Sequence, residues 1–152
     1  LEEAFDKSEA YLSLCRVLLQ QQNTPTAQRD LAKGLILGYL TRRTLSKTTK
    51  QPDETIELQR QSKMLLEEAN ALAEALHAGD PEDARSLELW AETHYNMALL
   101  QFDGQDYELA SESAGALVAH VRREHARGVE NERSIAILKA AVELQRICAE
   151  RK

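Results

Sequence analysis

Aromatic residues and turn formers are scarce in this chain of 152 residues. Phe, Trp and Tyr together make up 5% of it, and there are only 6 glycines and 3 prolines. Sheet-rich folds use more aromatic side chains and more turns, so this composition argues against them and favours helices. Apolar residues at 43% and charged residues at 29% are ordinary for a globular protein, and the length suits one domain, residues 1–152, with its own core.

An excess of basic charge and a long apolar run are also missing. The net charge is −6, whereas phosphate backbones and anionic membranes attract clustered Lys and Arg. The densest apolar stretch, Leu35 to Leu40, is interrupted by Gly38 and is far shorter than the roughly 20 residues of a membrane span. We therefore expect neither a nucleic acid nor a membrane as partner. Because the chain starts at Leu1 without a Met, we expect a fragment of a longer protein. Separately, we expect a cytoplasmic location.

The sequence lacks the signatures of common catalytic and metal sites. There is no GxSxG elbow for a nucleophilic serine and no GxxxxGK[ST] loop for phosphates. A di-iron bundle needs Glu-x-x-His on each of two helices, and a zincin needs His-Glu-x-x-His; neither requirement is met. We expect no enzyme activity, no metal and no cofactor. Cys15 and Cys148 have no CxxC spacing and are expected to be buried thiols, with a disulfide open only if the first and last helices meet.

Prolines and capping residues divide the chain into six helical segments. Thr24-Pro25, Gln51-Pro52 and Asp80-Pro81 each precede a helical pattern, as Pro at a first helical position loses no hydrogen bond. Asp106 and Asn131 are further start signals, and Gly128 is a stop signal. The predicted helices cover residues 1–22, Pro25 to Leu45, Asp53 to His77, Pro81 to Phe102, Asp106 to His125 and Asn131 to Arg151. The polar segment from Ser46 to Asp53 is predicted to be an exposed loop.

Apolar residues recur at helical spacing in each segment, and two segments carry particular expectations. In the first, the predicted buried face consists of Leu1, Phe5, Ser8, Leu12, Cys15, Leu19 and Gln22, widened by Ala4, Tyr11 and Leu18. The second contains GLILGYL, which is apolar nearly all round and predicts a central helix. Its two glycines, Gly34 and Gly38, indicate close packing against a neighbouring helix. The cluster Arg42, Arg43, Lys47 and Lys50 at its end is expected to be a solvated helix end, or else a contact for an acidic partner.

The stretch AETHYNMALLQFDGQDYELASESAGALV, Ala91 to Val118, resembles a tetratricopeptide repeat. Met97 and Ala98 match the Leu–Gly pair of the family's first helix, Asp106 and Tyr107 match its turn, and Ala110 matches the small residue of its second helix. The departures from the pattern are His94 in place of a Trp, Gln101 in place of an aromatic residue, Gln105 in place of the turn Gly, and Leu117 in place of a second small residue. The likeness covers about a fifth of the chain.

This resemblance implies an all-α fold of about six antiparallel helices in consecutive hairpins, as a right-handed tetratricopeptide-like solenoid. It also implies a non-catalytic scaffold that binds a peptide or protein segment in a concave groove. The groove candidates are Asn96, His94, Glu92, Thr93 and Gln101 on the fourth segment.

A compact antiparallel bundle for oligomerisation or regulation within a larger protein is the alternative. A solenoid fragment would leave apolar residues open on its end helices, and self-association would follow. The end-helix residues expected to be open in that case are Leu1, Phe5, Leu12, Ile137, Leu144 and Cys148.

Overall fold

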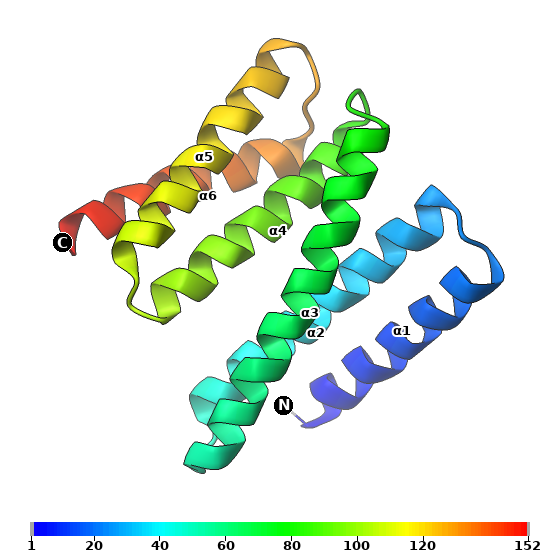
Figure 1. Ribbon diagram of the computed structural model, residues 1–152, viewed down its shortest axis with the longest axis vertical. Coiled ribbons are helices and arrows are strands. Elements are labelled where there is room, and N and C mark those ends of the chain that lie inside the picture. Colours follow the sequence, from blue (N-terminus) through cyan, green and yellow to red (C-terminus); the bar gives the residue numbers. More distant parts are fainter. Residues whose placement is uncertain (1, 152) are drawn as a thin grey trace. The chain divides into compact units, whose positions relative to one another are not determined.

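The computed structural model describes residues 2–151 and confirms the all-α prediction (Figure 1). Six helices and no strand occur in that range. They are α1 (Glu2–Gln21), α2 (Pro25–Thr48), α3 (Pro52–Gly79), α4 (Ala84–Asp103), α5 (Tyr107–Ala126) and α6 (Glu132–Glu150). Their contacts group them into two compact units, one up to Leu76 and one from His77 onward, so that only the last turn of α3 belongs to the second unit.

Helix starts follow the predicted caps at three places. The Thr24 hydroxyl accepts a hydrogen bond from the Ala27 amide, and the Asp106 carboxylate accepts one from Leu109. Asn131 accepts from the Ser134 amide while Ser134 accepts from the Asn131 amide, which is a reciprocal capping box. The prediction that the fourth helix starts at Pro81 is wrong. Pro81 lies in a turn, and the helix begins three residues later because Asp83 caps it through the Arg85 amide.

The segment from Ser46 to Asp53, predicted to be an exposed loop, is shorter than expected. Helix α2 continues to Thr48, and only residues 49–51 separate it from α3. Hydroxyl groups at the end of α2 bond back to the helix, as Thr44 and Thr48 do to carbonyls three or four residues earlier. These bonds satisfy the polar side chains locally, so the polar composition of residues 46–48 does not end the helix.

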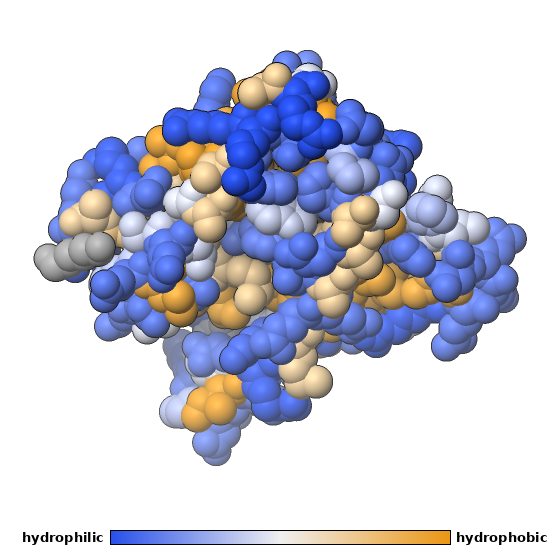
Figure 2. Space-filling view, turned by 45° about the horizontal axis from the view of Figure 1, so that its top comes forward, coloured by the Kyte–Doolittle hydropathy of each residue, from blue (hydrophilic) through white to orange (hydrophobic). Residues whose placement is uncertain are grey.

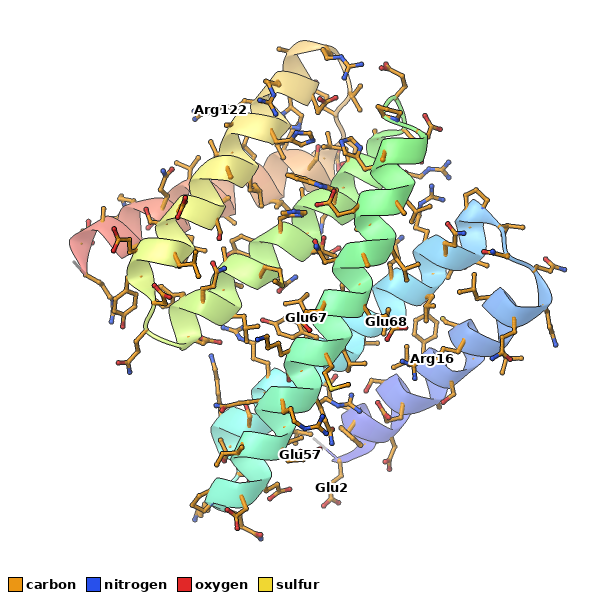
Figure 3. All side chains as sticks on the ribbon, viewed as in Figure 1. Glu2, Arg16, Glu57, Glu67, Glu68 and Arg122 are labelled. Atoms are coloured by element: carbon orange, nitrogen blue, oxygen red, sulfur yellow. The ribbon has the colours of Figure 1, made fainter. Side chains whose placement is uncertain are left out.

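In the first unit, α1 and α2 form a hairpin and α3 packs against both. A Cβ added at Gly38 would lie 3.1 Å from Leu65 Cδ1, and one at Gly34 would lie 3.5 Å from the Tyr11 ring. Both glycines therefore allow the close packing that their spacing predicts. Arg16 of α1 and Glu68 of α3, labelled in Figure 3, form an exposed ion pair at 3.0 Å.

Arg42 links all three helices of this unit, and its prediction as a solvated helix-end residue is wrong. Its guanidinium is buried, pairs with Glu9 of α1 at 2.8 Å and donates from Nε to Gln61 of α3 at 3.1 Å. It also donates to the Gly38 carbonyl and lies 4.9 Å from the Phe5 ring centre. A position that looked like a charged helix end is thus the polar centre of the unit.

Parts of two predicted buried faces are exposed. On α1, Ser8, Leu12 and Cys15 are buried as predicted, whereas Tyr11 and Leu18 are exposed. On α2, Leu35, Ile36 and Tyr39 are buried, whereas Leu37 and Leu40 are exposed. Leu1, assigned to the same face of the first helix, lies outside the described residues.

The second unit is a packed set of α4, α5 and α6 around apolar side chains. One cluster includes Leu87, Trp90, Leu117, Val121 and Ile137. The other contains Ala98, Ala110, Ala114, Leu144 and Cys148, with Phe102 and Tyr107 in edge contact beside it. Ile137, Leu144 and Cys148 of α6, like Leu12 of α1, are therefore covered and not open as the solenoid argument expected.

Two turns in this unit share one hydrogen-bond pattern. After α4, the amides of Gln105 and Asp106 donate to Phe102 and Gln101; after α5, the amides of Gly128 and Val129 donate to His125 and Glu124. Both are Schellman motifs, which need a left-handed residue just past the helix end. That residue is Gln105 (φ 63°) in the first turn and Gly128 (φ 89°) in the second, which confirms Gly128 as a stop signal.

Candidate functional site

Two of the five predicted groove residues on α4 have buried side chains that bond to their own helix. The Thr93 hydroxyl donates to the Trp90 carbonyl at 3.0 Å and has no exposed surface. The Asn96 side-chain amide donates to the Glu92 carbonyl at 2.9 Å. Both bonds run three or four residues back along the helix, the usual alternative to solvent for a short polar side chain in a helix interior.

The other three predicted residues are partly exposed. Glu92 pairs with Arg133 of α6 at 3.1 Å. The Gln101 side-chain oxygen is buried and accepts no hydrogen bond within residues 2–151. His94 donates from Nδ1 to the Trp90 carbonyl, a 2.8 Å contact in which the carbonyl can only accept.

The α4 residues come together with histidines that the sequence did not associate with them. Trp90 lies between two imidazoles, with ring centres 3.8 Å from His94 and 4.2 Å from His120 of α5. His77, on the last turn of α3, lies 6.0 Å from Trp90 and contacts His120 through the two Nε2 atoms, 2.9 Å apart. Because 43 residues separate this pair, no local spacing could have indicated it.

The electrostatics of His120 follow from this packing. Its burial and the nearby His77 lower its pKa from the ordinary value of 6.5, and Arg123 and His94 act in the same direction. Glu124 acts in the opposite direction, but its carboxylate is paired with Arg127 at 2.7 Å. The cluster therefore favours a neutral His120 near neutral pH.

Four exposed apolar side chains of the first unit gather on α1, whereas Ile56 and Met64 are exposed on α3. We call Tyr11, Leu14, Val17 and Leu18 the α1 apolar face; their exposed fractions are 40%, 55%, 47% and 42%. Tyr11, Leu14 and Leu18 are spaced three and four residues apart, so they form one stripe along the helix, with Val17 beside it. Figure 2 shows apolar residues interrupting an otherwise polar surface.

Helix α2 borders the α1 apolar face. The Tyr11 ring lies against Gly34, and exposed Leu37 is on the next turn of α2. Burial and a hydrogen bond with Cys15 raise the pKa of Tyr11, so its hydroxyl is neutral and the stripe carries no charge of its own. Two exposed lysines, Lys7 and Lys33, stand four residues before Tyr11 and Leu37. The helical spacing of Tyr11 and Leu18 on α1 was visible in the sequence. The predicted buried face of α1 was too wide, because it included these two exposed residues.

Neither the histidine cluster around Trp90 nor the α1 apolar face has the ligands of a metal centre. Within residues 2–151, no group of three or more His, Cys, Asp or Glu side chains could hold a metal ion. In the same range, no helix has both the length and the apolar character that crossing a bilayer requires. Cys15 and Cys148 are buried thiols, as predicted.

Comparison with known proteins gives no relative. No protein-family model, no curated protein and no solved structure matches this chain.

Proposed function

We propose that this chain is a non-catalytic protein-binding module and that its α1 apolar face holds an amphipathic helix of a partner protein. The observation that carries the proposal is the exposure of Tyr11, Leu14, Val17 and Leu18 on a single helix face. Contiguous exposed apolar residues usually mark an interaction site, whereas single ones are common on any surface.

The spacing of the stripe favours a helical partner. Apolar residues three and four residues apart form the seam that one helix offers to another. Burying the exposed part of four such side chains contributes roughly 3–5 kcal/mol before the costs of association. We therefore expect a weak and reversible complex.

Charge favours a different protein over a second copy of this chain. Lys33 lies one turn before Leu37 of α2, so acidic residues beside the partner's apolar stripe would complement its charge, whereas Lys7, one turn before Tyr11, already pairs with Glu3 at 2.7 Å. A second copy would instead bring together two chains of net charge −6.

The tetratricopeptide-like stack of hairpins is part of the same proposal. In such a stack an end helix keeps an apolar face that the next repeat or a partner covers, and the α1 apolar face supports this reading. The assignment of Asn96, His94, Glu92, Thr93 and Gln101 to a groove stays a prediction. Oligomerisation through α1 is the second candidate function, favoured by the same face and opposed by the net charge.

A synthetic peptide can test the proposal. The probe is a helical peptide of about three heptads, with Leu at three- and four-residue spacing and Glu beside that stripe. We expect the chain to bind it and the double variant Leu14→Glu/Leu18→Glu to weaken binding at least about tenfold, measured by fluorescence polarisation. A peptide of scrambled order and the variant Val142→Glu, at an exposed apolar position of α6, are the controls.

Two outcomes would contradict the proposal. Equal binding of the ordered and scrambled peptides would show that the face does not recognise a helix. If sedimentation shows that the chain dimerises and that Leu14→Glu/Leu18→Glu abolishes the dimer, the occupant is a second copy.

A further inference from the structure

Hydrogen-bond chemistry fixes where the protons lie in the contact between His77 and His120. The Nδ1 atom of His120 lies 3.2 Å from the Arg123 guanidinium, which can only donate. This nitrogen must therefore accept, and neutral His120 carries its proton on Nε2. That proton points to Nε2 of His77, 2.9 Å away, so His77 accepts there and carries its own proton on Nδ1.

The chain of bonds thus runs from Arg123 to His120 to His77 and requires both imidazoles to be neutral. A proton added to His77 Nε2 would face the N–H of His120. If His120 then moved its proton to Nδ1, that proton would face Arg123 instead. Every way of adding one proton breaks either the bond between the histidines or the bond to Arg123.

The charged groups around His120 do not compensate for an added charge. The groups facing His120 are His77 from α3, His94 from α4, and Arg123 and Glu124 from its own helix. Glu124 is the single acidic group among them, and Arg127 already pairs with it. The His77 Nδ1 atom is buried and has no hydrogen-bond partner within residues 2–151, so a charged His77 would gain no acceptor there.

We propose that His77, His120 and Arg123 form a pH-sensitive latch that holds the last turn of α3 against α4 and α5 near neutral pH and releases it in mild acid. Three helices contribute to it: His77 lies on the last turn of α3, His120 and Arg123 belong to α5, and Trp90 of α4 packs against both histidine rings. The latch is separate from the α1 apolar face and does not depend on the proposed function.

The direction of the pH effect follows from the lowered pKa of His120. Its pKa in the unfolded chain has the ordinary value of 6.5 and is lower in the folded chain, so the unfolded chain takes up the proton first as the pH falls. The stability that the latch contributes is fully present above about pH 6.5 and is lost as the pH falls toward the folded-state pKa.

The proton positions can be read directly in the wild-type chain by ¹⁵N NMR of the imidazoles at about pH 8. We expect His120 protonated on Nε2 and His77 on Nδ1. His120 protonated on Nδ1 would overturn the latch without any variant being needed.

A second experiment tests the release. Gln can place an amide nitrogen or oxygen near the position of Nε2 without titrating, so His77→Gln/His120→Gln keeps a hydrogen bond at the contact. We expect the urea midpoint to fall less for this variant than for the wild type between about pH 8 and pH 5.5. Over the same range, amides of His77 to Gly79 should lose protection from hydrogen exchange in the wild type only.

His125→Gln is the matched control, because His125 also lies on α5 but contacts Ser134 and not the latch. It should keep the full wild-type fall in urea midpoint. An equal fall for the double variant and the wild type, or unchanged protection at the end of α3, would overturn the proposal.

Discussion

Both units of this chain bury apolar side chains, as Leu35, Tyr39 and Leu66 do in the first, but the first unit also joins its three helices through a buried charge. In the first, a buried guanidinium joins α1, α2 and α3, and several large apolar side chains remain exposed. In the second, two clusters of buried apolar side chains lie between α4, α5 and α6. Apolar packing tolerates little loss of volume, whereas a buried charge depends on keeping each of its partners.

The connections between helices also differ between the two units. In the first unit each connection leads into a helix that begins with proline, and Thr24 caps one of them. In the second unit both connections after α4 and α5 use a left-handed residue, and the two positive φ angles within residues 2–151 are found there. Both units therefore fix the starts of helices, and the second unit also fixes the ends of α4 and α5 through left-handed residues.

The largest effect should come from the apolar packing of the second unit. Leu117 is fully buried in its first cluster, so Leu117→Ala should lower the free energy of unfolding by about 3 kcal/mol, measured by urea denaturation. A loss below about 1 kcal/mol would mean that the helices close around the cavity and that the packing is looser than described.

Removing the guanidinium of the first unit should be the next largest change. Arg42→Ala leaves Glu9 and Gln61 without their partner, and we expect a loss of about 2–3 kcal/mol. The value lies below that for a fully buried pair because Glu9 is partly solvated. Arg16→Ala, which breaks an exposed pair with Glu68, is the control and should cost less than about 1 kcal/mol. Equal losses in the two variants would mean that the buried guanidinium stabilises the first unit no more than an exposed ion pair does.

The turn after α5 should be sensitive to backbone conformation alone. A Cβ at Gly128 would meet no atom within 4 Å, so Gly128→Ala tests only the left-handed φ of 89°. We expect a loss of about 1–2 kcal/mol in urea denaturation. An unchanged free energy of unfolding would mean that the chain leaves α5 by a different turn.

The turn after α4 should respond in the opposite direction. Gln105 holds a left-handed conformation that glycine adopts without strain, so Gln105→Gly should raise the free energy of unfolding by about 0.5–1 kcal/mol. Gly104→Ala, at a position with negative φ, should show no such gain. A destabilised Gln105→Gly variant would indicate that the Gln side chain contributes more than its backbone strain costs.

Features encoded by neighbouring residues could be predicted from the sequence. The caps at Thr24, Asp106 and Asn131 and the stop at Gly128 depend on groups within a few residues. The placement of Gln105 where the repeat pattern has glycine marked the other left-handed turn, although its conformation was not predicted. The fourth helix starts after Asp83 and not at Pro81, because the Asp83 carboxylate accepts a hydrogen bond from the amide of Arg85 in the first turn of the helix and Pro81 stays in the preceding turn.

Features that depend on distant partners could not be predicted. Arg42 is buried because Glu9 and Gln61 meet it from two other helices, and helical spacing alone places it in a basic cluster. The exposure of Tyr11 and Leu18 was missed for a related reason, since periodicity gives the width of an apolar face but not how much of it a neighbour covers. The pairing of His77 with His120 spans 43 residues and has no sequence signature.

The position of Trp90 gives the molecule a built-in optical probe. It is the only tryptophan in the chain, and its indole is packed against the imidazoles of His94 and His120 in the second unit. Its fluorescence therefore reports the unfolding of that unit, whereas far-ultraviolet circular dichroism sums over the helices of both. If the unfolding curves from the two signals coincide, the chain unfolds in one cooperative transition. If they separate, the transition seen by fluorescence belongs to the second unit, and the unit that each variant destabilises can be identified.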